Sequence, residues 1–367
     1  MDINVKDKRD VMKNLLKILI VLTFFAIIFY YTVGTDDKTE PLVSSTGSSQ
    51  PIPKTEIVEN TSQYMARPET GISTFIGKES KEVMNQFGLP SRIEPSGYGY
   101  DWWIYLNENQ LQMYGVDDEI VRQVYTNSTL VDATPYMMNQ TLDDIYRMTL
   151  MESEIMVQVE DNYYIFMMNE QDMKTRLLIP FDGVFAQLYI DKESKQLTGI
   201  RYMDQTILLM HQPYEYQYVG EKLQGTATTS YEQLEVDHAY ANQLFDLVND
   251  LRIKNNVKKL LKSSILSEVA LIRSENLYIE QVMPTEEEED QSLVKLLDEY
   301  QILFKNEEEN LAMNYGDAIE AYHGWLNSEQ HKKNMLSSRY NVTGTGVYMG
   351  YFAQVFIEKE PEKNEKY

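Results

Sequence analysis

The chain has 367 residues, longer than one compact domain usually is, and its 43% hydrophobic residues are enough for real cores. Its formal net charge of −24 repels phosphate backbones and anionic headgroups, so nucleic-acid binding is not expected. It contains no cysteine, which excludes disulfides, thiolate metal sites and cysteine nucleophiles.

A nearly continuous apolar run extends from Leu15 to Val33. As a helix rising about 1.5 Å per residue, it nearly matches a hydrocarbon core of roughly 30 Å. Basic residues cluster before the run, and Asp36 and Asp37 follow it. The positive-inside rule therefore predicts a single-pass signal anchor over residues 15–34, with residues 1–14 as a basic cytoplasmic tail and the remainder outside the cell.

The chain around the end of this run favours an anchor that stays attached. A cleaved signal peptide is the alternative, but the run is longer than a typical signal core. Phe29, Tyr30 and Tyr31 also occupy positions where a cleavage site needs small residues. Residues 35–70 are rich in Ser, Thr, Pro and Glu and predict a flexible tether.

Residues 71–213 predict a middle domain of helices and antiparallel strands. A helix is expected over Lys78 to Phe87, with Ser80 as its cap and Gly88 as its end. The alternating segments that follow predict hairpin-linked strands near residues 100–106, 111–116 and 120–125.

A weaker copy of this plan begins near Thr141. Leu142, Ile145 and Met148 mark a short helix. Strands are expected near residues 154–160, 163–168, 184–190 and 197–203. The pattern predicts a tandem of two units, each a helix followed by a strand meander.

Trp102 and Trp103 are adjacent on one of the predicted strands. Because neighbouring strand residues face opposite sides, one ring is expected in the core and the other is a possible stacking surface for a ligand. Plain packing is the alternative for both rings.

The middle segment resembles a domain that precedes many bacterial CAP domains, the CAP-associated N-terminal domain. The resemblance runs from Ile76 to Tyr189 and is most specific in GYGYDWWIY, residues 97–105. In Gram-positive bacteria, the two modules travel together in secreted and membrane-tethered proteins. The resemblance implies no assigned chemistry for this domain.

Residues 214–236 predict an inter-domain linker, and helical periodicity follows at once. Leu244, Leu247, Val248 and Leu251 share one helix face. A second helix is expected after Ser263 or Ser264, a third after Asp317, and a short one from Ser328 to Leu336; strands are expected over residues 344–347 and 351–357.

Residues 237–358 resemble the CAP superfamily of cysteine-rich secretory, antigen 5 and pathogenesis-related 1 proteins. The resemblance rests on Leu247 to Arg252, on Glu309 to Ala312 and on Trp325 to His331. It implies an α-β-α sandwich, so the chain as a whole is expected to be α+β. Residues 359–367 are a charged tail.

The resemblance also implies a cleft with two histidines and acidic residues that can bind a divalent metal. Glu309, Asn310, Ser328 and His331 match that cleft. The second histidine is missing from residues 278–290, and Arg273 stands where some bacterial relatives carry a histidine, which places a like charge beside any metal.

Glu309 and His331 are therefore weak metal candidates. A catalytic metal needs about three protein ligands. Glu286 to Asp290 could supply the third, but such a run of acidic residues is by default expected to be exposed to solvent. A Glu309–His331 hydrogen bond without chemistry is the structural alternative. We predict no catalytic residue and no cofactor, with a divalent metal as the alternative.

The other candidates are weaker still. Ser328 and His331 could form a nucleophile pair, but Ser328 is better explained as a helix cap. His323 lies eight positions before His331, which is not a same-face helical spacing, and His211 and His238 are expected to be incidental.

The sequence thus predicts a cell-membrane protein whose own N-terminal helix holds its domains outside the cell. Its expected role is non-catalytic binding or scaffolding of an unidentified envelope ligand or protein, with no nucleic-acid partner. The alternative is a metal-assisted hydrolase acting on peptide or cell-wall substrate. A role in envelope assembly or sporulation through the middle domain is a third hypothesis.

Overall fold

The structure is a computed structural model that describes residues 40–44, 48–54, 64–107, 110–224, 229–282 and 292–359. The predicted anchor at residues 15–34 lies outside these ranges. Among the helices within them, none is long and apolar enough to cross a bilayer. The described residues from Pro41 onward belong to one unit.

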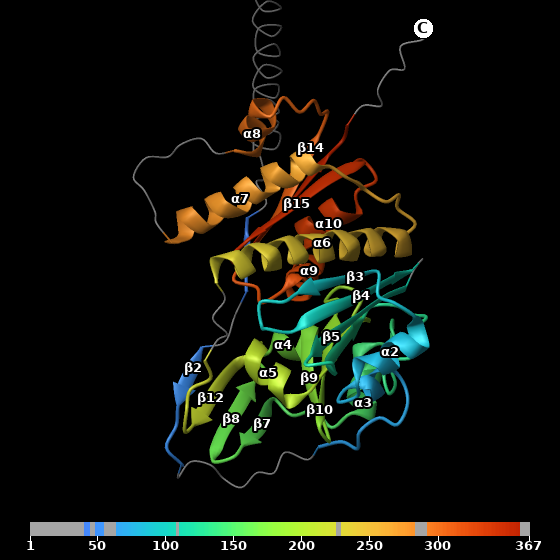
Figure 1. The fold of residues 1–367 in the computed structure, drawn as a ribbon, viewed down its shortest axis with the longest axis vertical. Coiled ribbons are helices and arrows are strands. Elements are labelled where there is room, and N and C mark those ends of the chain that lie inside the picture. The colour runs from blue at the N-terminus through green and yellow to red at the C-terminus, as the bar shows by residue number, and fades with distance from the viewer. Residues whose placement is uncertain are drawn as a thin grey trace, which may run out of the picture. The chain divides into compact units, whose positions relative to one another are not determined.

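A seven-stranded antiparallel sheet forms the centre of the middle domain (Figure 1). Its spatial order is β3-β4-β5-β6-β11-β10-β9. The strands are β3 (Arg92–Pro95), β4 (Asp101–Asn107), β5 (Gln110–Asp117), β6 (Ile120–Thr126), β9 (Arg176–Phe181), β10 (Val184–Ile190) and β11 (Leu197–Met203). Alternate residues enter different cores, since Leu177 and Ile179 join one cluster and Leu178 another. The sheet is therefore covered on both faces.

Short helices cover one face of this sheet, namely η2 (Ile72–Phe75), α2 (Ser80–Phe87) and α3 (Leu142–Met148). Val83 of α2 and Ile145 of α3 are fully buried against the sheet. Gly88, with a φ of 80°, ends α2 as predicted, but Glu79 rather than Ser80 occupies its N-cap position. The side chain of Thr141 caps α3.

A four-stranded sheet and helix α5 pack on the opposite face. Its order is β2-β12-β8-β7. These elements are β2 (Ser49–Pro51), β7 (Glu154–Val159), β8 (Asn162–Met167), β12 (Glu215–Val219), α5 (Gln205–His211) and the neighbouring α4 (Asp172–Thr175). The predicted tandem is wrong in its second half, because β7 and β8 build this separate sheet while β9, β10 and β11 join the first.

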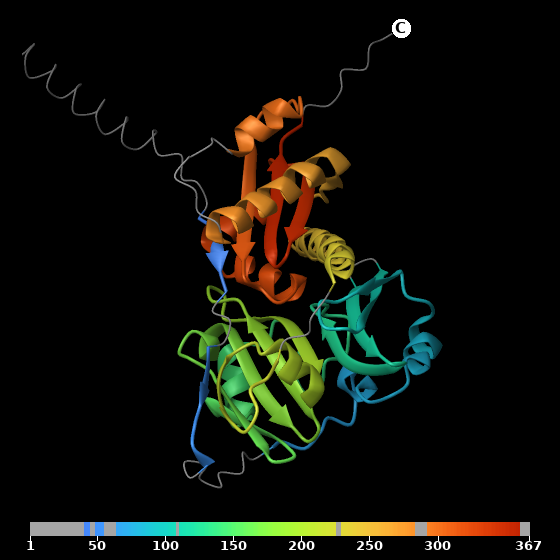
Figure 2. The same ribbon diagram turned by 60° about the vertical axis from the view of Figure 1, so that its left-hand side comes forward.

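The carboxy-terminal domain is a sheet between two layers of helices (Figure 2). The sheet order is β1-β14-β16-β15-β13. Its strands are β1 (Leu42–Val43), β13 (Leu261–Lys262), β14 (Glu307–Met313), β15 (Val342–Tyr348) and β16 (Tyr351–Ile357). Helices α6 (Ser230–Lys254), α9 (Ala318–Leu326) and α10 (Glu329–Leu336) lie on one face, and α7 (Ser264–Val282) and α8 (Leu293–Glu299) on the other. This is the expected α-β-α arrangement.

Local sequence explains how these helices begin and pack. Thr229 and Glu232 form a capping box at the start of α6. The Asp317 carboxylate accepts from the Glu320 amide at 2.9 Å and starts α9, as predicted. A Cβ on Gly346 would lie 2.1 Å from the Leu271 backbone nitrogen, so this glycine allows α7 to rest directly on β15.

Two segments expected as connectors contain strands instead. Strands β1 and β2 fall within the predicted tether of residues 35–70, and β12 and the start of α6 fall within the predicted linker of residues 214–236. β1 pairs in parallel with β14, and β2 pairs in parallel with β12. These short strands follow partners that are distant in sequence, so composition alone does not reveal them.

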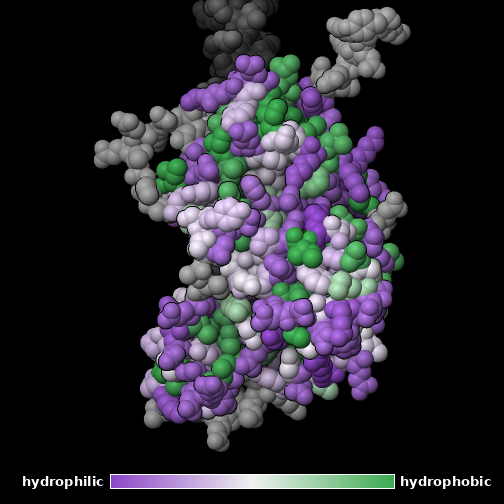
Figure 3. All heavy atoms as spheres, viewed as in Figure 1, coloured by the Kyte–Doolittle hydropathy of each residue, from purple (hydrophilic) through white to green (hydrophobic). Residues whose placement is uncertain are grey.

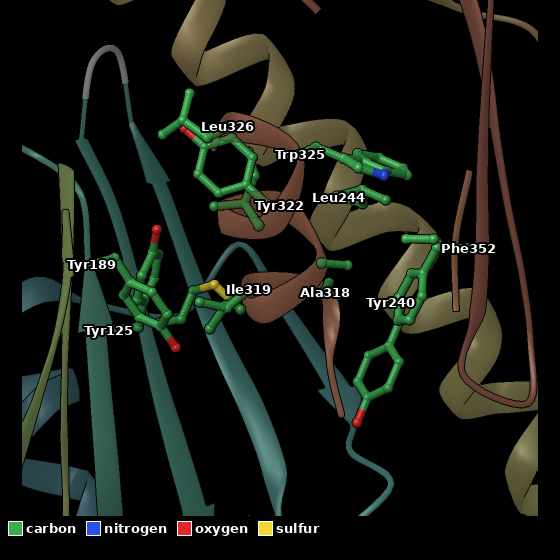
Figure 4. Packing of buried hydrophobic residues seen from close by; sticks show 14 of the residues in the cluster. Tyr125, Tyr189, Tyr240, Leu244, Ala318, Ile319, Tyr322, Trp325, Leu326 and Phe352 are labelled. Carbon is green, nitrogen blue, oxygen red and sulfur yellow. The ribbon is translucent and has the colours of Figure 1, made fainter. Parts of the chain in front are cut away.

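Helix α9 lies between the two domains (Figure 4). Trp325 belongs to the same buried cluster as Phe352 of strand β16, whereas Ile319 lies beside Tyr125 and Tyr189 of the middle domain. One hydrophobic core therefore continues from one domain into the other. The face shown in Figure 3 is mostly hydrophilic, with hydrophobic residues in small separate groups.

Candidate functional site

Asn310 connects strand β14 to helix α10. Its side chain is fully buried and donates from Nδ2 to the His331 carbonyl at 3.0 Å. Asn334 Nδ2 donates to Asn310 Oδ1, also at 3.0 Å. These hydrogen bonds of the two asparagine side chains hold helix α10, which carries His331, against strand β14, which carries Glu309. Asn310 therefore has a positioning role within the predicted cleft.

Glu309 pairs with Arg273 of helix α7. Arg273 Nε donates to Glu309 Oε2 at 2.8 Å, and Nη2 donates to Oε1 at 2.7 Å. The side chains expose 14% and 17% of their surface, so solvent screens the pair only partly. Burial acts to lower the pKa of Arg273, but the bonds and charge of Glu309 outweigh it and raise that pKa. The guanidinium therefore stays charged, and both carboxylate oxygens are occupied.

His331 pairs with Ser328 instead of Glu309. Ser328 Oγ lies 2.7 Å from His331 Nδ1, while Nε2 makes no hydrogen bond to any described residue. Burial lowers the pKa of His331 to about 4, against a smaller opposing effect of the Leu311 carbonyl. The imidazole is thus neutral at pH 7. Ser328 occupies the N-cap position of α10, but its hydroxyl bonds the imidazole and not the helix amides.

The Glu309–His331 hydrogen bond, the structural alternative to a metal site, is not formed, since each side chain has a different partner. The arrangement does not fit a catalytic metal either. Within the described ranges, no three His, Asp or Glu side chains gather as a metal site. Glu286 to Asp290, interpreted from the sequence as a solvated charge run that could supply a third ligand only exceptionally, lie outside those ranges. A metal ion beside Glu309 would also meet the positive charge of Arg273.

The two tryptophans divide between core and partial exposure. Trp102 is 0% exposed, so it is the core ring of the pair and offers no stacking face. Trp103 is half-buried and packs against the cluster on the other side of the sheet. The expected alternation of faces is confirmed.

A buried ionic cluster that the sequence analysis missed joins the two domains. Arg201 Nη2 of strand β11 donates to Asp317 Oδ2 at the start of α9 at 2.7 Å, and these side chains are 0% and 1% exposed. Arg201 Nη1 lies 3.0 Å from His211 Nδ1. Since arginine can only donate, Nδ1 accepts, and Nε2 carries the proton toward Tyr100 Oη at 3.0 Å.

His211 is therefore a buried member of this cluster, and the expectation that it is incidental is wrong. Burial, followed by the charge of Arg201, lowers the pKa of His211 to about 3, although Asp317 acts in the opposite direction. The neutral imidazole accepts from Arg201 while the carboxylate of Asp317 balances the guanidinium charge.

His323 of helix α9 fits into the middle domain. Its Nε2 lies 2.9 Å from Tyr125 Oη, and its ring stacks on Tyr189 with centroids 3.9 Å apart. Gly199 makes room for it, because a Cβ there would lie 2.6 Å from Nε2. Burial lowers the pKa of His323 well below its usual range, and the positive charges of Arg201 and Lys254 add to the effect.

One sequence signal could have revealed this interface. Strand β11 reads LTGIRYM, and six of its seven residues are buried. A strand without polar alternation is buried on both faces, so its Arg201 needs a partner from another element. Asp317, predicted only as a cap, is that partner.

Two family models match the chain. The CAP-associated N-terminal model matches residues 76–214, and the cysteine-rich secretory protein family model matches residues 245–357. The chain is 30% identical over 349 residues to the uncharacterized membrane protein YlbC of Bacillus subtilis (strain 168), an alignment that spans 95% of this chain and 100% of that protein. It is also 30% identical over 127 residues to YkwD of the same organism, or 33% of this chain and 48% of that protein.

Two solved structures are similar over most of their length. An extracellular protein containing an SCP domain from Bacillus anthracis str. Ames has a TM-score of 0.74 and 30% identity, covering 83% of this chain and 100% of its own. A cysteine-rich secretory protein from Staphylococcus aureus subsp. aureus Mu50 has a TM-score of 0.73 and 24% identity, covering 87% and 100%, and shows the shared fold alone. Together with the full-length relative, these findings show that the chain belongs to the cysteine-rich secretory protein (CAP) family and carries a CAP-associated N-terminal domain.

Proposed function

We propose that this protein is a membrane-tethered, extracytoplasmic module that binds an envelope ligand or partner without catalysis. The observation that carries the proposal is the bidentate pair between Arg273 and Glu309. A carboxylate held by two charge-assisted bonds is a poor general base and a poor metal ligand. The glutamate of the family motif thus stabilises the cleft instead of activating water.

The alternative, a metal-assisted hydrolase, has less support. It needs Glu309 and His331 to turn toward one ion, yet Arg273 holds the first and Ser328 pairs with the second. Breaking a largely buried ion pair by removing or turning away one partner costs several kcal/mol, roughly 3–5, which metal binding would have to exceed.

The proposed location rests on the predicted anchor and on the relatives. The full-length relative is named a membrane protein, and one similar structure is described as extracellular. We propose a single-pass topology with the N-terminus in the cytoplasm. A protease added to intact cells is expected to degrade a tag placed after Tyr367 and to spare a tag placed before Met1. The reverse pattern would refute the topology.

Metal analysis tests the absence of catalysis. The full chain, purified in detergent, is incubated with excess zinc, dialysed and analysed by elemental mass spectrometry. We expect well below one equivalent of zinc, and the same background for His331→Ala. One equivalent in the native chain, lost in His331→Ala while the unfolding temperature is unchanged, would establish a metal site and refute the proposal.

A further inference from the structure

A cavity of about 420 Å³ lies between the two domains, and neither Glu309 nor His331 lines it. Its walls come from four parts of the chain: strand β1 at the edge of the CAP sheet, the α4–β9 region and the end of β10 in the middle domain, and helix α9 with the residues that flank it. Representative residues are Leu42 and Val43, Asp172 and Arg176, and Glu320 and His323. Its volume is within the range of small-molecule sites, which extends from about 300 to about 1,000 Å³.

Three of the five charged side chains that line this cavity pair with one another. Arg176 Nη2 lies 3.1 Å from Asp172 Oδ1, and Arg176 Nη1 lies 3.8 Å from Glu320 Oε1. The cationic Lys192 and the anionic Glu329 are both exposed members of the lining. An ionic ligand would have to compete with these internal pairs, so the lining favours an uncharged ligand.

Two polar atoms of helix α9 lack hydrogen bonds. Glu320 Oε1, with Arg176 Nη1 no closer than 3.8 Å, accepts none, and His323 Nδ1 makes none, among the described residues; both atoms are buried in the cavity wall. The residues are three positions apart and therefore share one helix face, and both line the cavity. Glu320 Oε1 needs a donor, whereas the need of His323 depends on its tautomer. A hydroxyl group both donates and accepts, so it suits either atom after a small side-chain rotation.

The remaining walls combine aromatic, apolar and planar polar surface. Tyr315 contributes a phenol ring, Gln171 an amide and Leu42 of β1 an apolar side chain. Tyr189 is buried with its ring stacked on His323, and the Asn327 amide already bonds the backbone of Lys192 and Ile190, so these two only support the wall. Hydroxyl groups suit the Gln171 amide and the Glu320 carboxylate, and the C–H face of a pyranose suits an aromatic or aliphatic wall. An acetamido group adds a methyl for the apolar wall and an amide that both donates and accepts.

We propose that this inter-domain cavity binds an uncharged N-acetylated sugar, of mono- or disaccharide size. The proposal goes beyond the function proposed above, because it assigns a ligand class to a site that contains neither residue of the Glu309–Arg273 pair. Residues of both domains would contact the sugar. The packing of α9 between the domains would then hold the cavity walls of the middle domain and of the CAP domain at a fixed distance from each other.

The test is an isothermal titration calorimetry experiment in which the full chain is titrated with the β-1,4-linked disaccharide of N-acetylglucosamine. Maltose, which lacks acetamido groups, is the matched sugar. We expect saturable binding of the acetylated disaccharide with a Kd of about 1 mM or below, and at least tenfold weaker binding of maltose. Absence of saturation by the acetylated disaccharide would overturn the proposal, as would equal affinity for the two sugars.

Two tryptophan variants locate the binding site. Gln171→Trp adds bulk at an exposed residue of the lining, and its native side chain makes no capping bond to α4. We expect it to weaken sugar binding at least tenfold. Glu170→Trp, one residue earlier and 87% exposed in its side chain, does not line the cavity and is expected to bind like the native chain.

Both variants are first checked for a native unfolding temperature, and Val43→Trp, at an exposed position on the opposite wall, replaces Gln171→Trp if that variant fails to fold. Binding unchanged by the lining variant would place the sugar elsewhere and overturn the proposal. The zinc result is independent, so a chain that binds neither sugar nor zinc refutes only the sugar site.

Discussion

The guanidinium of Arg273 meets the carboxylate of Glu309 with two parallel hydrogen bonds at 2.7 and 2.8 Å. Arginine is suited to this geometry because its donors form a rigid, planar fork. A histidine at the same position would have a shorter side chain, an accessible neutral form and a nitrogen that binds metals. The side chain at position 273 therefore determines whether the Glu309 carboxylate is held in an ion pair or is available to a metal.

Replacing this arginine should change the metal chemistry of the cleft. Arg273→His removes the competing positive charge, releases Glu309 and adds an imidazole nitrogen beside that carboxylate. We expect zinc affinity to rise at least tenfold above that of the native chain, measured by competition with a chromophoric chelator. Arg273→Gln removes the charge without adding an imidazole and is the matched control, with an expected smaller gain. Equal affinities of the two variants would contradict this account.

Among the elements, helix α9 makes contacts in both domains. Its N-cap residue Asp317 pairs with Arg201, its second turn carries His323 into the middle domain, and Trp325 packs in the CAP core. Gly199 on strand β11 is the counterpart of this helix, since any side chain there would collide with the His323 ring. The docking of α9 therefore depends on one missing Cβ.

A Cβ at this position should weaken the whole fold. Gly199→Ala places a carbon 2.6 Å from His323 Nε2, and overpacking of this kind costs about 1–3 kcal/mol. We expect the free energy of unfolding, measured in urea, to fall by that amount. In a His323→Ala background the collision is absent, so the same substitution should cost markedly less. Equal costs in both backgrounds would show that the two residues do not interact.

Periodicity and caps predicted several elements because they act within a few residues. Gly88 ends α2, Thr141 starts α3 and Asp317 starts α9, as expected from their local chemistry. Strands β1, β2 and β12 were not predicted, because their hydrogen bonds come from β14, β12 and β8, which are distant in sequence. Such short strands contain too few residues to show an alternation.

At the candidate site too, the sequence indicates which residues lie there but not which residues they pair with. Motif resemblance selected Glu309, Asn310 and His331 as cleft residues, and the structure places the Glu309 backbone, the Asn310 side chain and the His331 carbonyl at the β14–α10 contact. It did not predict their partners, since Arg273 arrives from another helix and Ser328 turns away from its own helix amides. The cluster around Arg201 was missed because its members are spread across both domains.

At the scale of the whole molecule, the two domains share one core. The cluster that contains Trp102 and Tyr125 of the middle domain also contains Leu244 and Trp325 of the CAP domain. Unfolding one domain alone would expose this shared core and break the buried ion pair, so it is unfavourable. We therefore expect a single cooperative transition for the described part of the chain.

The buried histidines predict how this stability depends on pH. Their folded pKa values are depressed, to about 3 for His211 and about 4 for His331, and well below the usual range for His323. The unfolded chain, with a histidine pKa of about 6.5, therefore binds protons that the native state refuses. Stability should fall as pH drops below about 6.5, by up to about 1.4 kcal/mol per pH unit for each histidine.

Chemical unfolding between pH 7 and pH 5 measures this slope above the range in which most carboxylates titrate. His331→Asn is expected to reduce the slope by up to a third, whatever its effect on stability at pH 7. His238→Asn, at the exposed histidine of α6, is the control and should leave the slope unchanged. Stability that is flat across this interval would show that the three imidazoles are not held neutral by burial.

The short strand β1 gives the inter-domain cavity one weak boundary. It pairs with β14 over two residues, and the Ser44 backbone N–H also donates to the Met313 carbonyl at 3.0 Å. Leu42 and Val43, which form that pairing, also line the cavity. A pull on the chain ahead of Pro41 would thus peel this edge loose long before it disturbed the cores.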